Sequence, residues 1–197
     1  NVALADGACE IYFYRGGYGG LSRVEGGLSN LCFIVAARDV RARGSDAERV
    51  MREVVLTNRR AAETLSGARV CTEWLAVALE SFGRAELAPC AGLLTVGDAA
   101  AFIDPFTGSG MLMALEGGAV AAAAVARALP GLRAGASFAA LAADYRAGYR
   151  ARFAARLRVC ALLRRAAFAP PLVTEAATVA LNASARARRI LARATRQ

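Results

Sequence analysis

The segment LLTVGDAAAFIDPFTGSGMLMALEGG, residues 93–118, constrains the fold more than any other part of the chain. Residues 93–96 form a short apolar run that is typical of a buried strand. Gly97 permits a sharp turn without a Cβ clash, so Asp98 stands at the carboxyl end of the predicted strand. An Ala-rich helix is then predicted over residues 108–129. The sequence thus places a carboxylate between a strand and a helix, where ligands of open α/β sheets bind.

Small residues and a proline introduce this predicted helix. Pro105 fixes a rigid turn, and the glycine-rich residues 107–110 lead into the helix with little side-chain bulk. The first-turn amides of Gly110, Met111 and Leu112 have no acceptor within the helix, so they favour a negatively polarised group. The chain therefore directs a carboxylate and a set of free amides toward one site.

Two alternatives remain for this segment. Asp98 and Asp104 would each have a purely structural role if their carboxylates only capped a turn or the helix. The glycines at Gly108 and Gly110 resemble a phosphate-binding loop only loosely, because they do not directly follow a strand and their spacing differs. A nucleotide phosphate loop is therefore not predicted here.

The residue types absent from the chain exclude several kinds of chemistry. The 197 residues include no His, which removes Ser-His-Asp and Cys-His catalysis and the commonest metal ligand. The five Cys are far apart and form no C-x-x-C pair, so no metal site is predicted. Their odd number indicates reduced thiols and a cytoplasmic location. No signal peptide opens the sequence, and residues 111–129 are too weakly apolar for a membrane span, which predicts a buried helix.

The chain is strongly basic, with 25 Lys and Arg against 16 Asp and Glu and a formal charge of +9. Every basic residue is Arg, and Ala occurs throughout, a pattern that compositional bias explains. The arginines are scattered and lack interleaved aromatic residues, so no nucleic-acid partner is predicted. A non-enzymatic alternative stays open, in which the chain is a basic helical module that binds an anionic membrane surface or nucleic acid.

Glycine and capping signals divide the N-terminal part of the chain. Glycine pairs separate strand-type residues and predict antiparallel strands joined by tight turns, with residues 31–35 as a buried strand. Ser45 and Glu48 form a capping-box signature for one helix that ends at Gly67. Residues 68–83 mix β-branched, aromatic and small residues in rough alternation, which predicts one or two strands. The glycine pairs are Gly16–Gly17, Gly19–Gly20 and Gly26–Gly27.

The C-terminal part is predicted to be helical. Pro130 and the glycines after it should end the Ala-rich helix. Residues 137–167 carry apolar side chains at helical spacing, although Arg152 and Arg156 interrupt the apolar stripe. A last helix is predicted from about Leu172.

The segment GDAAAFIDPFTGSGM, residues 97–111, resembles the second FAD-binding motif of the flavoprotein monooxygenase superfamily. More narrowly, it is similar to the geranylgeranyl-reductase-like branch, where the usual form is G-D-A-A-G-F-x-D-P-x-T-G-x-G. Order, spacing and flanking segments agree from about Tyr12 to Ala124. Ala101 replaces the usual Gly, and Ser109 stands at a position that is often acidic. The N-terminal G-x-G-x-x-G loop that holds the ADP half of FAD has no counterpart, so the resemblance covers the C-terminal half only.

The resemblance implies specific contacts with FAD. Asp98 would accept hydrogen bonds from the ribityl chain, and Gly97 would allow its close approach. Pro105 would lie beside the isoalloxazine ring, and the amides that begin the helix would face the pyrimidine edge. Tyr18 and Trp74 are candidates for the substrate side. The implied cofactor-binding residues are Gly97, Asp98, Asp104, Pro105, Gly108, Gly110, Met111 and Leu112.

The fold class that follows is α/β, here as an α+β fragment. An antiparallel sheet segment should precede the C-terminal part of an FAD-binding Rossmann-like domain, followed by C-terminal helices. The expected segments are a substrate-side sheet and helix (1–88), the second FAD-binding motif as strand, loop and helix (89–130) and a helical region (131–197).

The expected function is that of a flavin-dependent oxidoreductase acting as part of a longer protein, with this chain alone inactive. FAD is the expected cofactor and NAD(P)H a candidate electron donor. The reaction would be reduction of a prenyl-like double bond or hydroxylation, with a prenyl-like or aromatic small-molecule substrate. The missing N-terminal half is an expected partner, and a peripheral membrane contact is a further expectation. No catalytic residue and no metal ligand is assigned.

Overall fold

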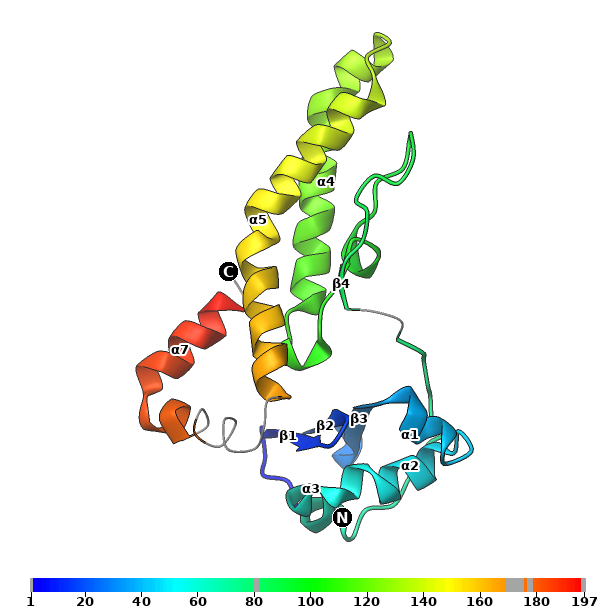
Figure 1. Ribbon diagram of the computed structural model, residues 1–197, viewed down its shortest axis with the longest axis vertical. Coiled ribbons are helices and arrows are strands. Elements are labelled where there is room, and N and C mark those ends of the chain that lie inside the picture. Colours follow the sequence, from blue (N-terminus) through cyan, green and yellow to red (C-terminus); the bar gives the residue numbers. More distant parts are fainter. Residues whose placement is uncertain (1, 80–81, 169–175, 177–178, 196–197) are drawn as a thin grey trace. The chain divides into compact units, whose positions relative to one another are not determined.

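The chain has a mixed α/β fold, seen in a computed structural model (Figure 1). Internal contacts divide it into two compact units, Asn1–Ala78 and Leu79–Gln197. The expected segments 89–130 and 131–197 both belong to the second unit, and the expected segment boundaries stay predictions. The structure describes residues 2–79, 82–168, 176 and 179–195.

The first unit contains a three-stranded antiparallel sheet in the order β1-β2-β3. Strands β1 (Cys9–Tyr14), β2 (Gly17–Arg23) and β3 (Ser29–Val35) confirm the predicted antiparallel strands. The predicted burial of residues 31–35 is wrong, because each of them is half-buried or exposed in β3. The predicted turn at Gly19 and Gly20 is wrong, because both residues are paired inside β2. A Cβ at Gly19 would meet the neighbouring strand at 3.3 Å, so the missing side chain serves close packing here.

The single helix predicted over residues 45–67 is interrupted. The first helix is capped by Asp46 instead of Ser45. The Asp46 carboxylate accepts a hydrogen bond from the Arg49 backbone amide at 3.0 Å. A second helix then begins because the side-chain oxygen of Asn58 accepts a hydrogen bond from the Ala61 amide at 3.0 Å. The helical elements of this unit are α1 (Ala37–Arg41), α2 (Ala47–Glu53), α3 (Arg59–Leu65) and the 3-10 turns η1 (Glu25–Gly27) and η2 (Val55–Thr57).

The core of the first unit lies between the sheet and these helices. Tyr12 and Leu21 from the sheet pack with Val50, Val55 and Ala61 from the helical side, and all five are almost completely buried. Buried apolar side chains from both layers therefore hold the unit together.

The strands predicted over residues 68–83 are largely absent. Residues 68–79 form no strand, and Leu75 and Val77 are 97% and 81% exposed. Alternating residues form a strand only where a neighbouring strand supplies hydrogen bonds, and none does so here within the described chain. Among the described residues of this range, strand pairing is limited to Gly83, which with Arg84 forms the short strand β4 of the second unit.

The second unit is built on a helical hairpin. Helices α4 (Gly110–Arg133) and α5 (Phe138–Ala167) run side by side (Figure 1). Ser137 caps α5 with its hydroxyl, which confirms the predicted helix 137–167. Strand β4 pairs with β5 (Ala101–Phe102) in a two-stranded antiparallel sheet. The other elements are the 3-10 turns η3 (Gly97–Ala99) and η4 (Pro105–Thr107) and the helix α7 (Ala185–Ala194).

Apolar side chains fill the interface between the two long helices. Met113 and Ala124 from α4 pack with Tyr145, Tyr149 and Phe153 from α5, and each is at most 4% exposed. The helical spacing of the α5 residues, visible in the sequence, thus reports the buried face correctly.

The strand predicted over residues 93–96 does not form. The Val96 backbone is extended, with φ −136° and ψ 167°, but the segment joins no ladder in the part of the chain that is described. Leu93 and Val96 are 48% and 42% exposed. A buried strand needs neighbouring strands to pair with, and this apolar run has none among the described residues.

Helix α4 departs from the prediction at its end and on its exposed face. It continues past Pro130 to Arg133, and Gly135 follows with φ +88°. One face is buried, while Met111 and Leu115 are 85% and 75% exposed, so the predicted burial holds for one side only.

Helix α4 also bears on the membrane question. The prediction that residues 111–129 are too weakly apolar for a membrane span is wrong, because by length and composition α4 is the one helix of the described chain apolar enough to cross a membrane. Of its most apolar stretch, 22% is buried. A core helix of a soluble protein meets the same criterion, so this property does not assign a location.

The predicted last helix lies partly outside the described residues. Residues 172–175 and 177–178 belong to that part, while residues 179–183 and helix α7 are helical.

Candidate functional site

Asp98 lies in the turn η3, directly after the apolar segment 93–96. Gly97 has φ +59°, a backbone conformation that glycine adopts without strain. A Cβ at Gly97 would lie 3.5 Å from the Cβ of Ala114, because η3 packs against the first turns of α4. The Asp98 side chain is exposed, and no described residue pairs with it or donates a hydrogen bond to it. An unpartnered carboxylate therefore stands beside the beginning of α4.

A buried tyrosine holds this turn in place. The Tyr145 hydroxyl donates a hydrogen bond to the Thr95 carbonyl at 2.6 Å. Tyr145 is completely buried on α5, and this burial raises the pKa of its phenol, so the group stays a neutral donor. On the same helix, Arg146 binds the Glu86 carboxylate at 2.7 Å. Both contacts fasten the segments around the Asp98 turn to α5.

Replacing Tyr145 by phenylalanine should lower the free energy of unfolding by about 1–2 kcal/mol, because the Thr95 carbonyl loses its donor. Urea unfolding followed by circular dichroism measures the change. Tyr149→Phe is the matched control: Tyr149 is 2% exposed on the same helix, and its hydroxyl donates no hydrogen bond to a described residue. Equal losses in the two variants would contradict the anchoring role of Tyr145.

Asp104 supports the second turn, η4. Its carboxylate accepts a hydrogen bond from the Phe106 amide at 3.4 Å and pairs with the Arg164 guanidinium at 3.4 Å. The guanidinium carbon lies 3.8 Å from the centre of the Phe82 ring, which stacks on Phe102. Asp104 is 4% exposed, so its carboxylate is used within the protein. This arrangement is the capping alternative that the sequence left open.

Ser109 has a structural role that the sequence did not reveal. Ser109 is 1% exposed, and its hydroxyl donates a hydrogen bond to the Thr195 carbonyl at 2.5 Å. This bond fastens the end of α7 to the residue that precedes α4. Its partner lies 86 positions away along the chain, so no local pattern could have predicted it.

The N-terminus of α4 presents free amides. Met113 makes the first helical hydrogen bond, to the Ser109 carbonyl at 3.0 Å, and the Ser109 side chain does not cap the helix. No acceptor within the described chain binds the amides of Gly110, Met111 and Leu112. Such a helix end attracts an anion or an electron-rich oxygen. The preceding Pro105 and Gly108 are both exposed.

All eight predicted cofactor-binding residues lie in the second unit, within the 16 consecutive positions 97–112, from η3 to the first turn of α4. Tyr18 and Trp74, the predicted substrate-side residues, belong to the first unit. Tyr18 is 6% exposed within β2, with its ring 5.9 Å from that of Phe13. Trp74 packs edge-on against Phe33 with ring centres 5.5 Å apart. Each therefore has a packing role within its own unit.

A buried ionic cluster joins α4 and α5. Arg156, 1% exposed, places a guanidinium nitrogen 2.9 Å from the Glu116 carboxylate, which Arg152 also binds. Burial alone would raise the pKa of Glu116, but the two guanidinium groups outweigh it and hold this pKa below its usual value. The signal in the sequence was the pair Arg152 and Arg156, which interrupts the apolar stripe. Their partner Glu116 is the one acidic residue of α4.

No group of three His, Cys, Asp or Glu side chains that could hold a metal ion occurs in the described part of the chain. Comparisons of the chain with known protein families, with curated proteins and with solved structures found no match.

Proposed function

We propose that the chain is the flavin-contacting part of an FAD-dependent oxidoreductase similar to the geranylgeranyl-reductase-like branch of the flavoprotein monooxygenases. One observation carries the proposal. The Asp98 carboxylate lies on a turn packed against α4, and within the described residues neither this carboxylate nor the first amides of that helix have a partner. A ligand with hydroxyl donors at one end and electron-rich oxygens at the other would satisfy both sets of groups.

FAD has this distribution of polar groups. Asp98 would accept hydrogen bonds from the ribityl hydroxyls, and the amides of Gly110, Met111 and Leu112 would donate to the pyrimidine edge of the flavin. Pro105 would flank the ring, while Asp104 holds the turn through Arg164. In this proposal residues 89–130 are the C-terminal part of a Rossmann-like FAD domain.

In this proposal the cofactor carries out the redox step, and the protein binds and orients it. When bound, the flavin would supply two-electron chemistry, either reducing a prenyl-like double bond or supporting hydroxylation of a small molecule. The residues of this chain bind and orient the ring, and the positive end of α4 favours negative charge on the pyrimidine edge. NAD(P)H is the proposed electron donor, and the ADP half of FAD would bind to a separate nucleotide-binding half.

A flavin titration tests the proposal. The full chain should quench the fluorescence of riboflavin, FMN and FAD with similar affinity, because the proposed contacts involve only the part that the three share. The reduced flavin should bind about fivefold more tightly than the oxidised form, since a helix N-terminus contributes about 1 kcal/mol toward added negative charge. Absence of binding at millimolar riboflavin, or equal affinity for both redox states, would contradict the proposal.

A further inference from the structure

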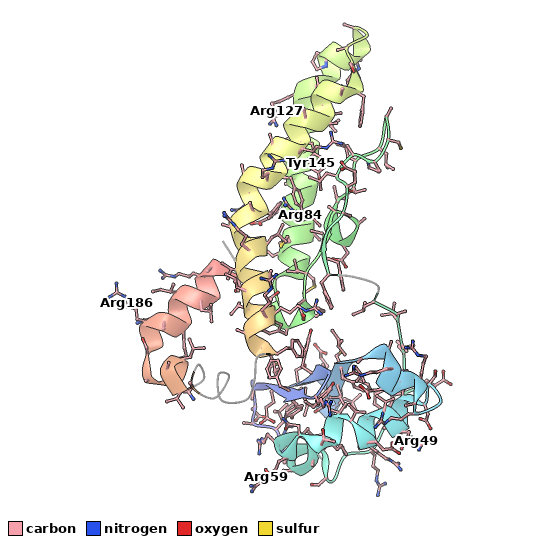
Figure 2. The ribbon with its side chains drawn as sticks, viewed as in Figure 1. Arg49, Arg59, Arg84, Arg127, Tyr145 and Arg186 are labelled. Carbon is pink, nitrogen blue, oxygen red and sulfur yellow. The ribbon has the colours of Figure 1, made fainter. Side chains whose placement is uncertain are left out.

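Helix α7 carries three arginines on one side. Arg186, Arg189 and Arg193 are spaced by three and four residues, so they share a helix face, and Ile190 lies between them. All three arginines are exposed, Ile190 is 59% exposed, and the four side chains line a shallow hollow. Figure 2 shows Arg186 pointing outward from the helix. These four residues are called the arginine face.

No carboxylate among the residues that the structure describes neutralises the charge of the arginine face. No described carboxylate forms an ion pair with Arg186, Arg189 or Arg193. Residues 176–197 contain five Arg and no Asp or Glu. By contrast, three exposed arginines of the first unit, Arg49, Arg52 and Arg59, each pair with a Glu four positions away along a helix.

The arginine face is held outward by contacts on other sides of α7. The Thr195 carbonyl accepts the hydrogen bond from Ser109, and Leu191 is half-buried. Arg188 donates to the carbonyls of Leu181 and Asn182 at 2.7 Å, which fastens the start of the helix. These contacts therefore leave the arginine face exposed, with no carboxylate partner among the residues that the structure describes.

The residues around the charges favour one kind of anionic partner. An aliphatic side chain amid arginines suits a lipid interface, where the guanidinium groups bind phosphates and the apolar group enters between head groups. Val179, 68% exposed, adds a second exposed aliphatic side chain in the helical segment before α7. Residues 176–197 include no aromatic side chain on which a nucleic-acid base could stack.

We propose that the arginine face of α7 docks the protein on an anionic phospholipid surface. Arg186, Arg189 and Arg193 bind head-group phosphates, and Ile190 enters the interface. This docking stands independently of the proposed flavin site, because it uses none of the residues assigned to FAD.

Vesicle co-sedimentation of the full chain tests the docking. The protein should bind vesicles of phosphatidylcholine with about one third phosphatidylglycerol at ~0.15 M salt, lose binding at ~1 M salt, and not bind phosphatidylcholine alone. The triple variant Arg186→Gln/Arg189→Gln/Arg193→Gln should bind about a hundredfold more weakly. Ile190→Ser should weaken binding severalfold without changing the net charge.

The matched control is Arg49→Gln/Arg52→Gln/Arg59→Gln, which removes the same number of charges from exposed positions in the first unit. This control should retain vesicle binding. Equal losses in the two triple variants would overturn the proposal, because overall charge would then drive binding. Equal binding to neutral vesicles would overturn it as well, and so would duplex DNA binding more tightly than anionic vesicles through the same three arginines.

Discussion

Replacing Glu116 by leucine should lower the free energy of unfolding by about 3 kcal/mol, the largest stability effect expected in the chain. Arg156 has a completely buried side chain, and its guanidinium lies 2.9 Å from the Glu116 carboxylate. Removal of that carboxylate leaves a buried positive charge without its acidic partner, which costs far more than loss of an exposed ion pair. Urea unfolding of the purified chain measures the difference.

The exposed ion pair between the same two helices provides the control. Arg127 on α4 binds Asp144 on α5 at 2.8 Å, with side chains 61% and 47% exposed, so Asp144→Leu should cause a much smaller change. The double variant Glu116→Leu/Arg156→Met should recover much of the loss, because it buries no charge. Similar effects for Glu116→Leu and Asp144→Leu would contradict the role assigned to burial.

The same cluster predicts a pH dependence. The pKa of Glu116 is lowered in the folded chain, so its contribution to stability is complete above the unfolded pKa of about 4.3 and is lost as the pH falls through the lower folded value. Chemical unfolding at a series of pH values should therefore show a smaller loss of stability below about pH 4 in Glu116→Leu than in the wild type. Identical acid profiles for the two proteins would argue against the ionic cluster.

Replacing Asp98 by alanine should weaken riboflavin binding about tenfold to a hundredfold, because hydrogen bonds to a charged group contribute about 1.5–3 kcal/mol. The free energy of unfolding should stay unchanged, since the exposed Asp98 side chain has no partner among the described residues. Fluorescence titration and urea unfolding give the two quantities for the same variant.

The control for this substitution is Asp6→Ala, which removes one negative charge at an Asp side chain that is 95% exposed in the first unit. It should leave flavin affinity unchanged. If Asp98→Ala instead retained flavin and lost about 1 kcal/mol of stability, Asp98 would be a structural cap.

Local signals in the sequence predicted the elements whose causes are local. Strand-type residues beside glycine pairs predicted the antiparallel strands of the first unit, and the apolar spacing that begins at Ser137 predicted α5. The break at Asn58 was missed because a capping side chain competes with helical periodicity, and the apolar pattern continues across the break.

Features that depend on distant residues could not be predicted in the same way. An apolar run such as 93–96 becomes a strand only if other strands lie beside it, and a local pattern does not contain that information. Likewise, the sequence showed Arg156 only as an interruption of the apolar stripe, because its partner Glu116 lies on a different helix. At the candidate site, the positive φ of Gly97 could be predicted because glycine adopts it readily. The ion pair between Asp104 and Arg164 could not, because the two residues are distant in the sequence.

The most direct test of the flavin site is an amide NMR titration of the ¹⁵N-labelled full chain with riboflavin. The account predicts progressive shifts at the amides of Asp98, Gly110, Met111 and Leu112, with little change at the α7 arginines or at Trp74. Shifts confined to other residues, or none at saturating riboflavin, would contradict it.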